Sequence, residues 1–193
     1  MRYILASMSP RRSELLSSMG LEFEICPADI DENIGVNNPE KLVTMLALLK
    51  ASFVASKYTD QEVVVIAADT VVAIDGEILG KPSDELDAHN MLRKLSGKKH
   101  TVYTGYCCAR ADNGNMVSRC AKADVYFREI SDKEIEDYIK TGEPMDKAGA
   151  YGIQGIGRQF VLRTKGEFSC VMGLPVEALG KLLKEEFSFE GGE

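Results

Sequence analysis

The sequence has little of what zinc sites and disulfide frameworks require. Its 193 residues include two histidines and five cysteines, and no two cysteines have the CxxC spacing. A zinc site of histidine and cysteine is therefore not expected, and any bound metal is expected to be a hard cation held by oxygen ligands. An odd number of cysteines without a framework favours reduced thiols, which are typical of cytoplasmic proteins.

Positive charge and long apolar runs are also scarce. Lys and Arg number 23 against 30 Asp and Glu, which gives a formal net charge of -7. Nucleic acid is not an expected partner, because its binding requires a basic surface. The apolar run 42–49 lies between Lys41 and Lys50 and is too short to cross a membrane. The apolar start 3–6 is soon interrupted by Ser7 and two arginines, so no secretory signal is expected.

Helical and strand patterns alternate along the chain. Helices are expected at 10–19, 39–57, 83–95, 131–140 and 175–187. Strands are expected at 3–6, 23–26, within 63–82 on both sides of an Asp75-Gly76 turn, and at 99–110, 116–127, 160–164 and 169–171. Residues 27–38 and 142–157 read as loops, and the last four residues as a frayed end. Early alternation with hairpins in the middle predicts an α/β fold with a mixed sheet, and no composition shift divides residues 1–193 into domains.

The stretch SMSPRRSELL, residues 7–16, predicts an unusual helix start. Ser9 has the character of an N-cap and Pro10 suits the first helical position. Arg11 and Arg12 then fall in the first turn, where the helix dipole favours acids. A phosphate bound at this N-terminus would offset that penalty, whereas a plain capped helix with two solvent-facing arginines is the alternative. Adjacent helical residues face different directions, so one shared phosphate is not expected.

Asp69 and Lys81 are two further candidates for binding or catalysis. Asp69 lies inside an apolar run, and a buried carboxylate is costly unless it is paired or bound to a metal. Its position after VVVIAA predicts the carboxyl end of a core strand, where α/β proteins bind ligands; a sheet edge or turn is the alternative. Lys81 lies between Gly80 and Pro82, which suits a phosphate-binding point charge or an ordinary exposed lysine.

The segment DKAGAYGIQGIG, residues 146–157, contains four glycines that could let the backbone approach a ligand. It has neither the GK[ST] of a P-loop nor the spacing of a dinucleotide fingerprint. A tight structural turn is the alternative. Lys147, Tyr151 and Gln154 are the side chains in this segment that could recognise a substrate.

Six segments in order resemble one known family. LASMSPRRSELL, DIDE, AADTVV, GEILGKP, MLRKLSGKKHTVYTG and GEPMDKAGAYGIQGIG are similar to the Maf family of nucleotide pyrophosphatases. The likeness runs from residue 5 to about residue 175. It implies an α/β fold with a twisted sheet, flanking helices and a substrate cleft. It also implies hydrolysis of nucleoside triphosphates to monophosphate and pyrophosphate, a Mg²⁺ or Mn²⁺ cofactor and a homodimer.

The resemblance also implies roles for individual residues. The positions that match phosphate contacts are Ser7, Arg12, Lys50 and Lys81. Glu32 and Asp69 match the acids tied to the metal and to water activation, with Asp69 as proton acceptor and Lys81 among the catalytic residues. The positions that separate subfamilies are Arg11, Thr70 and Gln154, and this trio resembles the dTTP/UTP group. The family often has a base near Met45, which this chain lacks.

The expected function is therefore a cytoplasmic pyrophosphatase acting on dTTP, UTP and modified pyrimidine nucleotides, with no membrane partner. Gln154 supports this, because its amide can both donate to and accept from the edge of uracil or thymine. One alternative keeps the reaction but acts on a methylated guanine or another purine nucleotide. The other is a nucleotide-binding regulator of cell division without catalysis, although pure binding does not require the paired acids.

Overall fold

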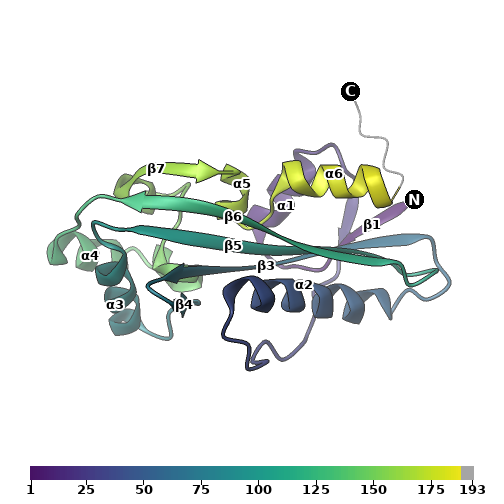
Figure 1. The fold of residues 1–193 in the computed structure, drawn as a ribbon, viewed down its shortest axis with the longest axis horizontal. Helices are drawn as coiled ribbons and strands as arrows, with labels where there is room; N and C mark the ends of the chain where they lie inside the picture. The colour runs from purple at the N-terminus through teal and green to yellow at the C-terminus, as the bar shows by residue number, and fades with distance from the viewer. Residues whose placement is uncertain (188–193) are drawn as a thin grey trace.

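The computed structural model describes residues 1–187, which form a seven-stranded mixed sheet with helices on both faces (Figure 1). The strands are β1 (Arg2–Leu5), β2 (Phe23–Ile25), β3 (Val63–Ile74), β4 (Glu77–Leu79), β5 (Lys99–Arg110), β6 (Met116–Phe127) and β7 (Val161–Gly166). Their order is β2-β1-β3-β5-β6-β7, with β4 paired to β3. Strand β1 is parallel to β2 and β3, and the other pairs are antiparallel. The predicted mixed α/β fold is confirmed.

The helices cover the sheet in separate groups. They are α1 (Pro10–Ser17), α2 (Pro39–Ala55), α3 (Glu85–Leu95), α4 (Asp132–Ile139), α5 (Phe168–Met172) and α6 (Val176–Glu186). In Figure 1, α2 lies along one face of the long strands and α1 and α6 lie over the other, while α3 and α4 gather at one end. No helix in the described part of the chain is long and apolar enough to span a membrane.

The alternation of side chains along β3 builds two apolar layers. Val64 and Ile66 belong to a core cluster shared with α1 and α6, whereas Val65 and Ala67 belong to a cluster shared with α2. This follows from the two-residue period of a strand, which sends neighbours to opposite faces. The adjacent Cys107 and Cys108 of β5 divide between the same two clusters, as a strand requires.

Helix α2 lies unusually close to the sheet at one point. A Cβ placed on Gly105 of β5 would lie 2.1 Å from the Val43 carbonyl oxygen, so only glycine allows this approach. Gly105 is also the strand partner of Asp69 in β3. The close packing therefore brings the backbone of α2 against the sheet at the level of a candidate site residue.

The turn predicted at Asp75-Gly76 and the capping box predicted at Ser131 are confirmed, with element ends shifted by one or two residues. Asp75 and Gly76 both have positive φ, 52° and 83°, as a tight hairpin turn requires. Ser131 and Glu134 form the reciprocal capping box at the start of α4. Helix α1 ends at Ser17 and α2 at Ala55, slightly before the predicted ends.

The predicted strand at 169–171 is wrong, because this segment is the short helix α5. Gly173 ends the helix in a left-handed conformation, φ 107°, and its N–H bonds to the carbonyls of Ser169 and Cys170. A short apolar run does not distinguish strand from helix by periodicity. The loop predicted at 142–157 contains 3₁₀ turns at Glu143–Asp146 and Ala148–Ala150 and the start of a third, Ile156–Phe160. The frayed end predicted for residues 190–193 lies outside the described residues.

Candidate active site

The site lies where β1 stops and β3 continues. Leu5, the last residue of β1, pairs with Ile66, and β3 runs on to Ile74 beside β5. Asp69 therefore lies in the middle of β3 and not at the end of a strand, which corrects the prediction. It does lie just beyond the carboxyl end of β1, the kind of edge where α/β sheets bind ligands.

A cleft with two connected parts opens at this edge. The Gln154 part is lined by residues of the glycine-rich segment and by Thr70, Tyr151 and Met172. The Glu32 part is lined by the loop before α1 and by Glu32 and Lys50. Both parts share the residues Ser9, Arg11, Arg12, Lys81 and Asp146. The three cations in the shared region place positive charge at the junction.

Asp69 and Thr70 are neighbours in β3 and serve opposite faces of the sheet. The carboxylate of Asp69 points to α2, where Lys50 Nζ lies 2.6 Å from its Oδ1. The hydroxyl of Thr70 points to the other face, where Arg12 approaches it. Two adjacent residues of β3 thus place a carboxylate on one face of the sheet and a contact with Arg12 on the other face.

Lys50 holds the two predicted acids together. Its ammonium lies 2.7 Å from Glu32 Oε1 and 2.6 Å from Asp69 Oδ1, and both Lys50 and Asp69 are buried. Burial acts to raise the pKa of Glu32, but the hydrogen bond and charge of Lys50, with Lys81 and Arg12, lower it overall. Asp69 Oδ2 has no hydrogen-bond partner among residues 1–187, so it remains a free acceptor beside Lys50, which lines the Glu32 part.

Arg12 is fixed by three acceptors on three segments. Its Nε donates to the Gly173 carbonyl at 2.8 Å, and its two terminal nitrogens donate to Ser7 Oγ at 3.3 Å and Thr70 Oγ1 at 3.2 Å. Burial lowers the pKa of Arg12, partly offset by the charge of Asp69. Since a guanidinium has five N–H donors, two remain for a ligand. The side chain is oriented before anything binds.

A chain of hydroxyls sets the direction of the bond between Thr70 and Arg12. Thr104, which is fully buried in β5, donates to the Cys170 carbonyl at 2.8 Å. A hydroxyl has one hydrogen, so Thr104 must accept from Thr70 across their 2.9 Å contact. Thr70 is then left with acceptor lone pairs only, one of which receives the Arg12 N–H.

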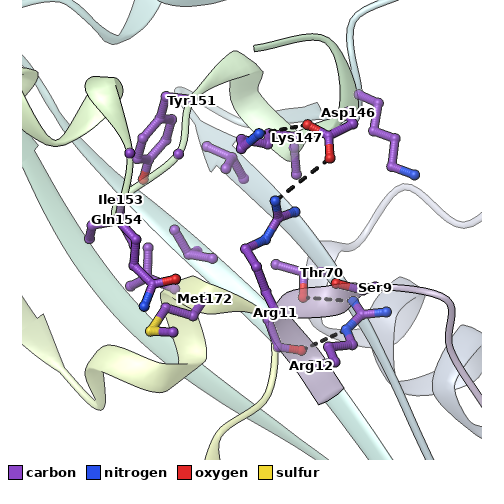
Figure 2. A pocket seen from close by; sticks show the side chains of 18 residues that line it. Ser9, Arg11, Arg12, Thr70, Asp146, Lys147, Tyr151, Ile153, Gln154 and Met172 are labelled. Atoms are coloured by element: carbon purple, nitrogen blue, oxygen red, sulfur yellow. Dashed lines mark hydrogen bonds and ion pairs between the residues drawn. The ribbon is translucent and has the colours of Figure 1, made fainter. Parts of the chain in front are cut away.

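Arg11 points away from Arg12, in agreement with the expectation that they do not share one target. Its guanidinium lies 3.7 Å from Asp146 Oδ2, across the Gln154 part of the cleft (Figure 2). Asp146 also holds the ammonium of Lys147 at 2.6 Å. Arg11 is only partly buried, and a pair at this distance leaves its remaining donors open to the cleft.

The start of α1 adds donors to the junction. Ser9 adopts N-cap geometry but makes no side-chain cap bond, and the buried Ser7 Oγ accepts from the Ser9 N–H. The N–H groups of Arg11 and Arg12 have no partner among residues 1–187. Lys81 is exposed, lines both parts and is likewise without an ion pair in that range. A helix N-terminus with free N–H groups beside cationic side chains favours the binding of an anion.

The Gln154 part contains one open amide among apolar groups. Figure 2 shows Gln154 opposite Arg11, with Tyr151, Ile153 and Met172 nearby. The Gln154 side chain is exposed and has no hydrogen-bond partner among the described residues. The Tyr151 hydroxyl is 2.9 Å from His100 Nε2, and burial lowers the pKa of that histidine to about 4, so it is neutral near pH 7.

Nine residues were predicted for the site; eight of them line this one cleft, and the ninth, Asp69, is bonded to the lining residue Lys50. The Glu32 part holds Ser7, Glu32 and Lys50, and the Gln154 part holds Thr70 and Gln154. The junction holds Arg11, Arg12 and Lys81, and Asp69 is connected to the Glu32 part through its bond with Lys50. Met45, where the family often has a base, is exposed on α2 and lines neither part.

Sequence reasoning missed the groups that orient these side chains. Thr104 and the Gly173 carbonyl act on Thr70 and Arg12 from residues 34 and 161 positions away in the chain. Nothing in the sequence indicated that these residues orient Thr70 and Arg12. Thr104 lies inside a strand pattern, and Gly173 follows a short apolar run. The glycine would have been informative only if the run had been predicted as a helix with a glycine cap.

The fold and cleft describe an α/β protein in which three cations line a cleft beside paired acids. The chain belongs to the Maf family, because the family model described as Maf-like protein matches residues 2–186.

Two curated relatives are similar over almost their whole length. A dTTP/UTP pyrophosphatase of Aquifex aeolicus (strain VF5) is 49% identical, over 96% of this chain and 95% of its own. A dTTP/UTP pyrophosphatase of Caldicellulosiruptor bescii is also 49% identical, over 95% of this chain and 94% of its own. Among solved structures, a nucleoside-triphosphatase / dITP/XTP pyrophosphatase from Mycobacterium abscessus covers 97% of this chain with TM-score 0.45 and 14% identity.

Proposed function

We propose that this protein is a nucleoside triphosphate pyrophosphatase that hydrolyses UTP and dTTP to the monophosphate and pyrophosphate. The carrying observation is the two-part cleft, in which Arg11, Arg12 and Lys81 lie between paired acids and an open amide. A nucleotide has the same order of groups, with a polyphosphate at one end and a base at the other. The names of the relatives support this substrate class.

The triphosphate binds at the junction and along the Glu32 part. Arg12 contributes its two remaining N–H donors, Lys81 contributes a point charge, and the free N–H groups at the start of α1 contribute neutral donors. Lys50 uses two of its three ammonium hydrogens on the acids, so one remains for a phosphate oxygen.

Asp69 accepts the proton of the attacking water. Its Oδ1 is held by Lys50, whereas Oδ2 is free to form a hydrogen bond with a water molecule in the cleft. The water oxygen attacks the α-phosphorus, the bond from that phosphorus to the bridging oxygen breaks, and pyrophosphate leaves. Arg12 and Lys81 stabilise the charge that develops on the leaving group.

The acids at this site fit a divalent cation such as Mg²⁺ or Mn²⁺. Residues 1–187 contain no cluster of three or more His, Cys, Asp and Glu side chains that could hold a metal by themselves. Magnesium is typically bound by one or two carboxylates together with substrate phosphates, and Glu32 and Asp69 supply two. The Lys50 ammonium already bridges these carboxylates as a cation would. When bound, the metal would neutralise phosphate charge and polarise water.

The base is recognised in the Gln154 part. The Gln154 amide can pair with the carbonyl and N–H on the edge of uracil or thymine. Thr70 has acceptor lone pairs only, so it suits a ligand that donates a hydrogen bond. Arg11 contributes donors from the opposite side (Figure 2). The proposal further takes residues 1–193 as one catalytic domain that acts as a cytoplasmic homodimer, as the family resemblance implies.

Product analysis tests this function. Purified protein with Mg²⁺ is incubated with UTP, dTTP, CTP, GTP and 7-methyl-GTP, and the products are separated by ion-exchange chromatography. We expect pyrophosphate and monophosphate, fastest from UTP and dTTP, and loss of turnover when EDTA removes the metal. Preference for 7-methyl-GTP would indicate the purine alternative. Release of orthophosphate, or tight UTP binding without turnover, would refute the proposal.

A further inference from the structure

We propose that Glu143, which lies outside the cleft, is a positioning residue that sets the selectivity of the site by holding the loop that carries Gln154. Glu143 is half-buried in the 3₁₀ turn Glu143–Asp146 and lines neither part of the cleft. This inference rests on the proposed function, since it concerns how the same site distinguishes bases.

The carboxylate of Glu143 receives three hydrogen bonds. Its Oε2 accepts from the Ile156 N–H at 2.8 Å, and its Oε1 accepts from the Gly157 N–H at 3.1 Å and from the Tyr138 hydroxyl at 2.9 Å. The same hydroxyl accepts from the Gly152 N–H at 3.1 Å. One carboxylate and one phenol thus bind the backbone at both ends of the segment 152–157.

The glycines of this segment make room for the carboxylate. A Cβ on Gly155 would lie 2.4 Å from Glu143 Oε2, and a Cβ on Gly152 would lie 2.9 Å from Oε1. A Cβ on Gly157 would lie 2.7 Å from the Tyr138 hydroxyl. The glycine pattern, read from the sequence as access for a ligand, is therefore required by the packing of the loop around Glu143.

On one side of Gln154 the side chain of Ile153 packs in the core, and on the other side the backbone is held by the Glu143 carboxylate. The Gln154 side chain has no hydrogen-bond partner among residues 1–187, so its place in the cleft follows from its backbone alone (Figure 2). That backbone lies between Gly152 and Gly155, inside the bonded segment. Loss of the Glu143 acceptors releases the backbone and with it the amide that meets the base.

The Glu143 carboxylate must be ionised to act in this way. All three groups that face it are donors, so each needs an oxygen lone pair. Burial acts to raise the pKa of Glu143, but the bonds from Ile156, Gly157 and Tyr138 lower it overall. In Glu143→Gln, an amide NH₂ must face a donor in either orientation, although the side chain keeps its size.

The experiment compares Glu143→Gln with the matched control Glu136→Gln. Glu136 is exposed on α4, and its carboxylate has no partner within the described chain. For each variant we measure the ratio of kcat/KM for UTP to that for CTP, and the ratio of the Kd of the α,β-imido analogue of CTP to the Kd of the same analogue of UTP. Hydrogen exchange of segment 152–157 reports loop order without a ligand. Tyr138→Phe is a second variant if Glu143→Gln does not fold.

We expect Glu143→Gln to lower both selectivity ratios by about tenfold and to speed exchange in 152–157, whereas Glu136→Gln has neither effect. In a Gln154→Ala background, Glu143→Gln should change the ratios no further, because it acts through Gln154. An unchanged ratio in Glu143→Gln, or an equal change in both backgrounds, would overturn the proposal. If the wild type binds nucleotides without releasing pyrophosphate, the proposed function fails. The Kd ratios and the exchange rates then still test the positioning role of Glu143.

Discussion

The two parts of the cleft are held together in different ways. In the Glu32 part the functional side chains bond directly to one another and to the sheet, as Lys50 does with Glu32 and Asp69. In the Gln154 part the open amide has no hydrogen-bond partner among residues 1–187, and a carboxylate outside the cleft bonds to the backbone that carries it. Under the proposed function, this difference has a physical reason. The two acids repel each other and need a cation between them, whereas the Gln154 amide keeps its hydrogen-bonding groups available for a base.

This difference predicts two classes of variant. Changes among the directly bonded charges should slow every nucleotide by a similar factor, because all nucleotides share the triphosphate. Changes around the open amide should alter the order of nucleotides with less effect on the best rate. Each variant is therefore assayed with UTP, dTTP and CTP.

Asp69→Asn should have the largest effect. The amide oxygen can still accept from Lys50, so the fold is retained, but the side chain no longer accepts a proton from water. We expect kcat to fall about 10²- to 10⁴-fold for all three nucleotides. Pyrophosphate release measures the rate, and circular dichroism confirms folding. Activity near the wild-type level would show that another group accepts the proton.

Arg12→Ala should slow all nucleotides by a smaller factor. It removes two ligand donors and leaves Ser7, Thr70 and the Gly173 carbonyl without their Arg12 bond. We expect kcat/KM to fall on the order of a hundredfold, with the nucleotide order unchanged. Arg12→Lys is the control that keeps the charge, but a lysine cannot reproduce three bonds with fixed directions. A change in nucleotide order would place Arg12 at the base instead.

The sequence predicted most of the helices and strands well. Asp69 stood out from the local pattern as a charged residue inside an apolar run, whereas Glu32 and Lys50 were indicated only by the family resemblance. The hairpin turn at Asp75 and Gly76 and the capping box at Ser131 depend on adjacent residues only, so local pattern was sufficient.

The orienting groups could not be predicted, because they depend on contacts between distant segments. Thr104 is a short polar residue in a strand, and only the packing of α5 over β5 gives its hydroxyl the Cys170 carbonyl as acceptor. Glu143 reads as an ordinary loop acid until the loop at 152–157 folds back on it. The error at 169–171 has the same origin, since a five-residue apolar segment takes its conformation from its surroundings.

Arg11→Ala should change the order of nucleotides. Arg11 is partly exposed and its contact with Asp146 is long, so stability should change little. Loss of its donors opposite Gln154 should shift the ratio of kcat/KM between UTP and CTP by about tenfold, while kcat for the best nucleotide changes less. Steady-state kinetics on the same panel measures both quantities. An unchanged ratio would return Arg11 to the role of a surface arginine.

Thr104→Val should have the smallest effect and tests how the two parts are joined. Valine fills the same volume but cannot accept from Thr70, so the Thr70 hydrogen is free to turn toward the Arg12 side. We expect kcat/KM to fall about three- to tenfold for all nucleotides, the range expected for one hydrogen bond. Thr104→Ser keeps the hydroxyl and should restore the rate. If Thr104→Val and Thr104→Ser are equally slow, volume in the core matters and the direction of the hydroxyl chain does not. If Thr104→Val instead lowers selectivity alone, the contact of Thr70 with the base outweighs its bond to Arg12, and the division between uniform and selective effects lies between Arg12 and Thr70.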